Sequence, residues 1–176
     1  MAAGTDPVLS LPELKADCSA CAALCCVGLA FDRGNSFAID KPAGQACPNL
    51  AGHACRIHDK LGDQGFSGCA AYDCVGAGQR TLALYSGISW QDDPTRLAPM
   101  LDTFAHLRRL HELIALLDTA AGLTLPASVE ARRLALLTQI CPETMTPAEA
   151  DSLATGPLPG AVRDFLRGLR DHLAPQ

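Results

Sequence analysis

The sequence predicts a mainly α-helical protein in which a cysteine-rich N-terminal half, organised by bound metal, packs on a C-terminal helical bundle. Eight of the nine cysteines lie between residues 18 and 74, in a segment with few long apolar runs that would need metal bonds to hold a fold. From about residue 94, apolar residues recur at spacings of three and four, the pattern of helices with one buried face. We therefore expect a loose tail over 1–12, a metal-binding region over 13–90 and a helical bundle over 91–176.

The C-terminal half carries start and stop signals for four helices. Asp93 followed by Pro94 is typical of an N-cap and a first helical residue, and Gly122 favours a stop. Thr146, with Glu149 three residues later, forms a capping box. The expected helices lie over residues 94–122, over 126–140, from Thr146 onward and over 159–173, the last with Arg163, Arg167 and Arg170 facing solvent. The apolar face expected for the second helix consists of Val129, Leu134, Leu137 and Ile140.

Two stretches of the N-terminal half have weaker patterns. "SFAID" (36–40) alternates polar and apolar residues, which indicates a short strand. "RTLALYSGISW" (80–90) fits either a strand or the start of a helix, and the pattern alone leaves this choice open.

The composition narrows the classes of function. The formal charge is −5, with 19 acidic against 14 basic residues, which argues against a nucleic-acid binder because such affinity rests on clustered basic charge. Aromatic residues are too few for a platform that stacks single-stranded bases, and no apolar run reaches membrane-spanning length. The N-terminus lacks the basic and apolar regions of a signal peptide. We therefore expect a cytoplasmic protein whose partner is another protein, with its oligomeric state left open.

The stretch "DCSACAALCC" (17–26) places four cysteines within nine positions. On a regular helix, Cys18, Cys21 and Cys25 would share one face. The next residue, Cys26, would point about 100° away from its neighbour. Either the backbone leaves the helix, or the adjacent thiolates serve different metal atoms of one cluster or of two sites. A disulfide within the pair would strain the peptide and is the poorest interpretation.

In the reducing cytoplasm, patterned cysteines indicate metal or redox chemistry more often than disulfides. Eight thiolates suit two four-cysteine sites, or one cluster with reserve thiols, and four-thiolate coordination is compatible with tetrahedral zinc and with iron–sulfur clusters. The expected ligands of the metal or cluster are Cys18, Cys21, Cys25, Cys26, Cys47, Cys55, Cys69 and Cys74. Cys141 stands alone and is interpreted as structural. His53 and His58 are candidate ligands of iron or zinc, but a surface or hydrogen-bonding role is the preferred interpretation.

Three cysteine motifs in order resemble a known family. "CSACAALCC", then "CPNLAGHACRIHDKL", then "GCAAYDC" are similar to the YkgJ type of cysteine-cluster protein, regarded as zinc- or iron-chelating. The resemblance covers roughly residues 17–80 and implies metal chelation, and some relatives of that family methylate proteins. "GFSGC" replaces the family's Arg-Pro stretch, so the last ligand is Cys69 or Cys74. The same region resembles the cysteine-rich N-terminal part of bacterial pentapeptide-repeat proteins, although no five-residue repeat follows.

These patterns leave three functions open. The first is an iron–sulfur protein with a redox or accessory role, which the adjacent Cys25–Cys26 pair favours because it suggests multinuclear binding. The second is a zinc protein whose four-cysteine sites are structural and whose helices present a surface to a partner. The third is a metal-dependent modifying enzyme, for which no catalytic residue is identified because no complete acid–base set appears. Tyr72 and Asp73 either tune the metal through hydrogen bonds or are turn residues.

Overall fold

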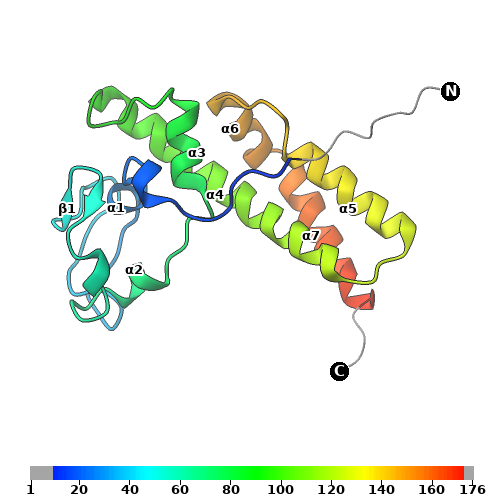
Figure 1. Cartoon of the computed structure of the whole chain (residues 1–176), viewed down its shortest axis with the longest axis horizontal. Helices are drawn as coiled ribbons and strands as arrows, with labels where there is room; N and C mark the ends of the chain where they lie inside the picture. The colour runs from blue at the N-terminus through cyan, green and yellow to red at the C-terminus, as the bar shows by residue number, and fades with distance from the viewer. Residues whose placement is uncertain (1–9, 173–176) are drawn as a thin grey trace.

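The computed structural model describes residues 10–172, and its fold is mainly helical, as the sequence predicts (Figure 1). The α-helices are α1 (Leu24–Gly28), α2 (Ser67–Ala71), α3 (Ala77–Leu84), α4 (Leu97–Thr119), α5 (Ala127–Ile140), α6 (Pro147–Thr155) and α7 (Leu158–Gly168). A small antiparallel hairpin pairs β1 (Leu50–Ala51) with β2 (Ala54–Cys55). Short 3₁₀ turns lie at Cys18–Ala20, His58–Lys60, Pro94–Arg96, Ala120–Gly122 and Leu169–His172. Loops and short elements therefore make up most of the cysteine-rich half.

The helices of the C-terminal half begin where their caps predict. The Asp93 carboxylate accepts a hydrogen bond from the Thr95 N–H at 3.1 Å, at the start of the 3₁₀ turn that leads into α4. At α6, the Glu149 carboxylate accepts from the Thr146 N–H at 2.7 Å, and the Thr146 hydroxyl accepts from the Glu149 N–H at 3.3 Å. This reciprocal pair confirms the predicted capping box.

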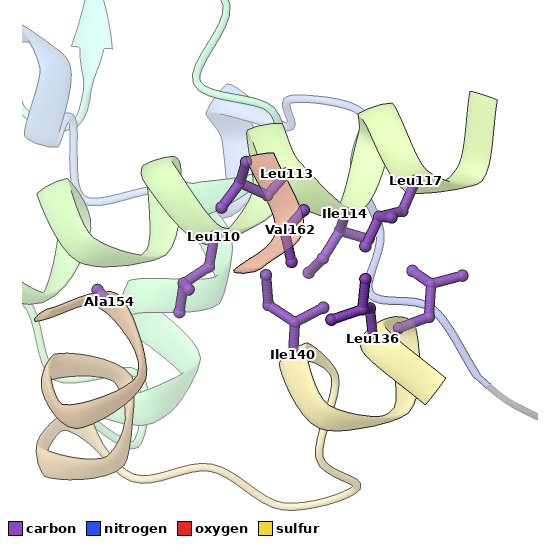
Figure 2. Close-up of a cluster of buried hydrophobic side chains, with 9 residues drawn as sticks. Leu110, Leu113, Ile114, Leu117, Leu136, Ile140, Ala154 and Val162 are labelled. Atoms are coloured by element: carbon purple, nitrogen blue, oxygen red, sulfur yellow. The ribbon is translucent and has the colours of Figure 1, made fainter. Parts of the chain in front are cut away.

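Helix α4 forms the centre of the helical half, where it packs against α5 and α7 (Figure 2). The side chains that meet there, each at most 2% exposed, include Leu110, Ile114, Leu117, Leu136, Ile140 and Val162. The prediction that Leu134 belongs to the buried face of α5 is wrong, because this side chain is 43% exposed. Arg133 is buried instead, so the buried face follows Arg133, Leu136, Leu137 and Ile140, and residue 134 lies about 100° outside it.

A second core joins the two halves of the chain. Ala22, Leu24 and Ala77 from the cysteine-rich half belong to one buried cluster with residues of α4 and α6. The members from these two helices are Met100, Phe104, Leu107 and Ala150. The Trp90 indole N–H also donates to the Ala22 carbonyl at 2.7 Å. The cysteine-rich half is therefore packed on the helices, as predicted, and shares its apolar interior with them.

The N-terminal half has less strand than its pattern indicates. The predicted strand over 36–40 is a turn instead, and a single antiparallel bridge joins Phe31 to Lys41 on either side of it. Phe37 stacks on Phe31 with ring centroids 4.5 Å apart, so the apolar residue of the expected strand packs within the turn. The ambiguous 80–90 stretch begins as a helix, because α3 continues to Leu84.

The two ends of the chain can be described only in part. Residues 1–9 of the expected loose tail lie outside the described residues, while Leu11 packs against the core of α4, α5 and α7. The last helix ends earlier than expected, at Gly168, and the predicted end at residue 173 also lies outside the described residues. Over residues 10–172, no helix is both long and apolar enough to cross a bilayer.

Candidate metal centre

The stretch from Cys18 to Cys26 is not one regular helix: the backbone leaves helical geometry, which is one of the two alternatives that the sequence leaves open. A 3₁₀ turn at Cys18–Ala20 ends in extended backbone at Cys21, and Ala23 has a left-handed conformation, with φ 55°, before α1 begins. A positive φ interrupts a right-handed helix. Cys18 and Cys21 are therefore placed independently of α1, whereas the adjacent Cys25 and Cys26 both lie inside it.

One set of thiols gathers beside α3. This first set consists of Cys18, Cys21, Cys25 and Cys74. A Cβ at Gly78 would lie 2.5 Å from the Cys21 sulfur and 3.8 Å from the Cys74 sulfur, so both sulfurs lie over the same glycine. Burial raises the pKa of Cys21 to about 11, and the charges of Cys25 and Cys74 contribute to the increase. Burial and the same two charges also raise the pKa of Cys18.

Contacts from α3 hold the N-terminal segment near this first set. The Gln79 side chain accepts from the Asp17 N–H at 3.2 Å and donates to the Lys15 carbonyl at 2.7 Å. At Gly76, a Cβ would lie only 2.1 Å from the Glu13 carbonyl oxygen, so a glycine is required for this close approach. These contacts fix the turn that carries Cys18 against the start of α3.

The other four thiols form a second set. Its members are Cys26, Cys47, Cys55 and Cys69. The Cys47 N–H donates to the Cys26 carbonyl at 3.0 Å, and β2 places Cys55 opposite Leu50, whose N–H donates to the Cys47 carbonyl at 2.9 Å. Burial raises the pKa of Cys69 to about 11, with contributions from the charges of Cys47, Cys25 and Cys55. Backbone hydrogen bonds therefore bring most of this set together.

Cys25 and Cys26 lie where the two sets meet. The Cys26 thiol is hydrogen-bonded to the Cys25 sulfur, which lowers the pKa of Cys25 to about 7 and raises the pKa of Cys26. The two residues border different apolar clusters: Cys25 borders the core that contains Ala22 and Ala77, and Cys26 borders a small cluster around Phe31. The two adjacent residues therefore supply one thiol to each set.

The thiols of each set lie near one another, but their sulfurs are not in the geometry of a metal site. Among residues 10–172, no three His, Cys, Asp or Glu side chains are already arranged to hold a metal ion. All nine cysteines are free thiols. In a four-thiolate zinc site, each sulfur lies about 2.3 Å from the metal. Metal binding would therefore require the sulfurs of each set to move closer together.

A buried hydroxyl beside the first set lacks a partner. The Tyr72 hydroxyl has no hydrogen-bond partner within the described part of the chain, and the Arg108 guanidinium lies 5.3 Å from the centre of its ring. Burial raises the pKa of Tyr72, and the charges of Cys25 and Cys74 raise it further. An unmade hydrogen bond of a buried group costs about 1–3 kcal/mol. A charged sulfur of the first set would be an acceptor for this hydroxyl, so Tyr72 fits a set of thiolates.

A buried cation lies beside the second set. Lys41 is 4% exposed, and its ammonium donates to the carbonyls of Val27, Pro42 and Gln45 at 3.1, 3.1 and 2.8 Å. Burial lowers the pKa of Lys41, whereas the charges of Cys47, Cys26, Cys25 and Cys69 raise it. No carboxylate contacts this ammonium in the described residues. Buried charges are normally paired, so Lys41 also fits a set whose sulfurs carry negative charge.

Other candidate residues from the sequence make ordinary contacts. His53 Nε2 lies 3.1 Å from the Ser89 hydroxyl, and the His58 side chain is 65% exposed. The Asp73 carboxylate accepts a backbone hydrogen bond within its own turn. Cys141 follows α5 and lines a cavity that contains none of the eight clustered cysteines.

Lys41 and Gly78 were not identified from the sequence. No pattern distinguishes the buried lysine of "DKPAG" from an exposed one, because its partners are backbone carbonyls: those of Pro42 and Gln45 in its own loop and that of Val27 from α1. Gly78 lies in "VGAGQR", whose glycines indicate a turn but not the thiol that approaches one of them.

The fold and the thiols together define a class, that of mainly helical proteins with a cysteine-rich half in which eight thiols form two adjoining sets. The chain is similar to the uncharacterized protein YybG of Bacillus subtilis (strain 168), with 35% identity over 147 residues, or 79% of this chain and 53% of that protein. The chain therefore spans about half the length of this curated relative. No family model matches the chain, so its resemblance to the YkgJ type and to pentapeptide-repeat proteins stays a prediction. No solved structure matches it either.

Proposed function

We propose that this chain is a metal-binding protein in which each set of four thiols holds one metal centre through thiolate bonds. The observation that carries the proposal is the packing of the cysteines in two groups. Cys25 and Cys74 border one apolar cluster, with the Cys21 sulfur near that of Cys74 over Gly78, and Cys26, Cys47 and Cys69 belong to another. Four thiolates per centre match the tetrahedral coordination of structural zinc. When bound, such an ion fixes the loops that carry its ligands and contributes folding free energy.

Two buried polar groups support charged sulfurs at these positions. Lys41 brings a positive charge to the second set, and the Tyr72 hydroxyl is an unused donor beside the first. Thiolates of the second set would supply a negative charge to pair with Lys41, and thiolates of the first set would supply an acceptor for the Tyr72 hydroxyl. Neutral thiols carry no charge to pair with Lys41, and their sulfur is only a weak acceptor for the Tyr72 hydroxyl.

An open surface pocket connects solvent with some of the thiols. It has a volume of about 1030 Å³, and its lining includes Cys18 from the first set, Cys69 from the second and Tyr72. A metal site needs a path from solvent to its ligands. This pocket reaches one thiol of each set.

An iron–sulfur centre with a redox or accessory role is the second candidate. The observation that favours it is the position of Cys25, whose charge acts on Cys69 of the second set as well as on the first set. Because Cys25 lies close to both sets, the eight thiols also form one continuous group, and such a group suits a centre with several metal atoms. Hydrogen bonds to its sulfurs would influence the reduction potential, and Tyr72 is the available donor.

Elemental analysis and an absorption spectrum of protein purified without oxygen test both candidates. Colourless protein with about two zinc ions per chain would support two four-thiolate sites. Brown protein that contains iron and acid-labile sulfide would support the iron–sulfur candidate. Cys141→Ser is the control and should retain the wild-type metal content, because Cys141 belongs to neither set. Metal-free protein with freely reactive thiols would contradict the proposal.

A further inference from the structure

A cavity in the helical half has no part in the proposed metal centre. Its volume is about 450 Å³, and it is bordered by α4, the end of α5 and residues 10–12. Its apolar lining includes Leu107, Leu110, Ile114 and Ile140. Pockets that bind small organic molecules have volumes of about 300–1,000 Å³, so the size and the lining suit a small, partly apolar ligand.

Arg80 of α3 brings a positive charge to this cavity, and none of the described carboxylates pairs with it. The other arginines that are at least half-buried each pair with a nearby carboxylate: Arg96 with Asp93, Arg108 with Glu112 and Arg133 with Glu130. Arg80 makes no ion pair with any side chain that the structure describes, whereas the pairs of the other three arginines are all close. Its neighbours three and four positions away along the chain are all uncharged. Glu143 also lines the cavity, but it is exposed and does not pair with Arg80.

His111 adds a hydrogen-bond acceptor to the same cavity. It is 2% exposed, and its Nδ1 lies 2.6 Å from the Val75 carbonyl oxygen. A carbonyl can only accept, so Nδ1 carries a proton and Nε2 of the neutral ring is left as the acceptor. Burial lowers the pKa of His111 and the charge of Arg80 lowers it further, whereas the hydrogen bond to Val75 raises it. The cavity therefore combines the Arg80 cation, the His111 acceptor and an apolar wall, with the exposed Glu143 carboxylate also in its lining.

We propose that this cavity binds a small organic carboxylate with an apolar body. The carboxylate pairs with Arg80, whose planar guanidinium matches carboxylate geometry. The body lies on Leu11, Cys141 and Met145, the apolar lining residues that are only partly buried. A single unpaired cation favours a monoanion over a phosphate dianion, which would need further donors. A hydroxyl or N–H on the ligand donates to His111 Nε2.

Octanoate is the probe, and octanamide, its uncharged analogue of similar shape, is the comparison. In calorimetric titrations of the full chain, octanoate should bind about tenfold more tightly than octanamide, as expected for a charge-assisted contact. Arg80→Gln should weaken octanoate binding by about tenfold and leave octanamide binding unchanged. Arg80→Lys keeps the charge and should retain part of the preference for octanoate.

Arg109→Gln is the matched control, because Arg109 is exposed on α4 and does not line the cavity. This variant should bind octanoate as the wild type does, and thermal unfolding of every variant checks that the fold is kept. Three results would each overturn the proposal: no binding of octanoate, equal affinity for octanoate and octanamide, or an equal loss in Arg80→Gln and Arg109→Gln.

Discussion

At Gly78, the absence of a side chain leaves room for two thiols of the first set. A Cβ there would lie 2.5 Å from the Cys21 sulfur, which is closer than non-bonded atoms approach. A free thiol can rotate away from a new methyl group at little cost. A thiolate bound to a metal is held by that bond, so the same methyl group would displace a ligand.

We expect Gly78→Ala to weaken metal binding by the first set by about tenfold or more, the usual cost of disturbing a group that positions a ligand. The second set should stay loaded. Gly160→Ala is the matched control, because Gly160 also lies within a helix and a Cβ there would meet nothing within 4 Å. The control should keep all its metal and gain about 0.5–1 kcal/mol in free energy of unfolding. Metal titrations of both variants check this, and unchanged binding in Gly78→Ala would contradict a metal-bound Cys21.

At the scale of single elements, the start of α6 makes stability depend on pH. The hydrogen bonds from the Thr146 hydroxyl and N–H hold the pKa of Glu149 below its ordinary value of 4.5. Because the folded-state pKa is depressed, the stabilisation from this carboxylate is fully present above pH 4.5 and is lost as the pH falls through the folded-state pKa.

We expect Glu149→Gln to lower the free energy of unfolding at neutral pH. The difference from the wild type should shrink as the pH falls below 4.5, because the wild-type carboxylate is then protonated as well. Denaturant titrations of both proteins across this pH range measure the difference. A difference that does not change with pH would mean that the charge of Glu149 does not stabilise the helix start.

The helices of the second half could be predicted because their signals are local. Asp93 and Thr146 accept hydrogen bonds from residues two and three positions further on, so the sequence contains both partners. The buried face of α5 could not be predicted at Arg133, which is 5% exposed and donates to the Leu117 carbonyl of α4 at 3.0 Å. This hydrogen bond joins two helices. The Arg133 side chain occupies the buried position that the pattern assigned to Leu134.

The cysteines could be identified as candidate ligands from the sequence, but their grouping could not. Cys26 meets Cys47 through a backbone hydrogen bond, and Cys21 meets Cys74 over Gly78. Both contacts join segments that are far apart in the chain, so no local sequence pattern predicts them. The sequence left open whether residues 18–26 form a regular helix, because the left-handed backbone of Ala23, which interrupts it, carries no signal in the sequence pattern.

At the scale of the whole molecule, the shared core couples the thiol-bearing loops to the helices. Leu24 and Ala77 pack in one cluster with Met100 and Phe104 of α4. Loops that lose their metal bonds would cover this part of α4 less well. The stability of the helices should therefore depend on metal at the thiols.

We expect removal of metal by a chelator, with the thiols kept reduced, to lower the midpoint of helix unfolding by about 4 °C or more, which corresponds to the loss of about 1–2 kcal/mol in a chain of this size. Thermal scans by far-ultraviolet circular dichroism measure the change, and added metal should reverse it. An unchanged midpoint would show that the helices fold independently of the thiol sets.

The central claim, that eight thiols form two four-cysteine metal sites, is tested most directly by metal content in variants that break one set at a time. Cys74→Ser removes a ligand of the first set, and Cys47→Ser removes one of the second. We expect about two metal centres per chain in the wild type, about one in each single variant and none in the double variant. Loss of all metal in either single variant, or full metal content in both, would contradict the division into two sites.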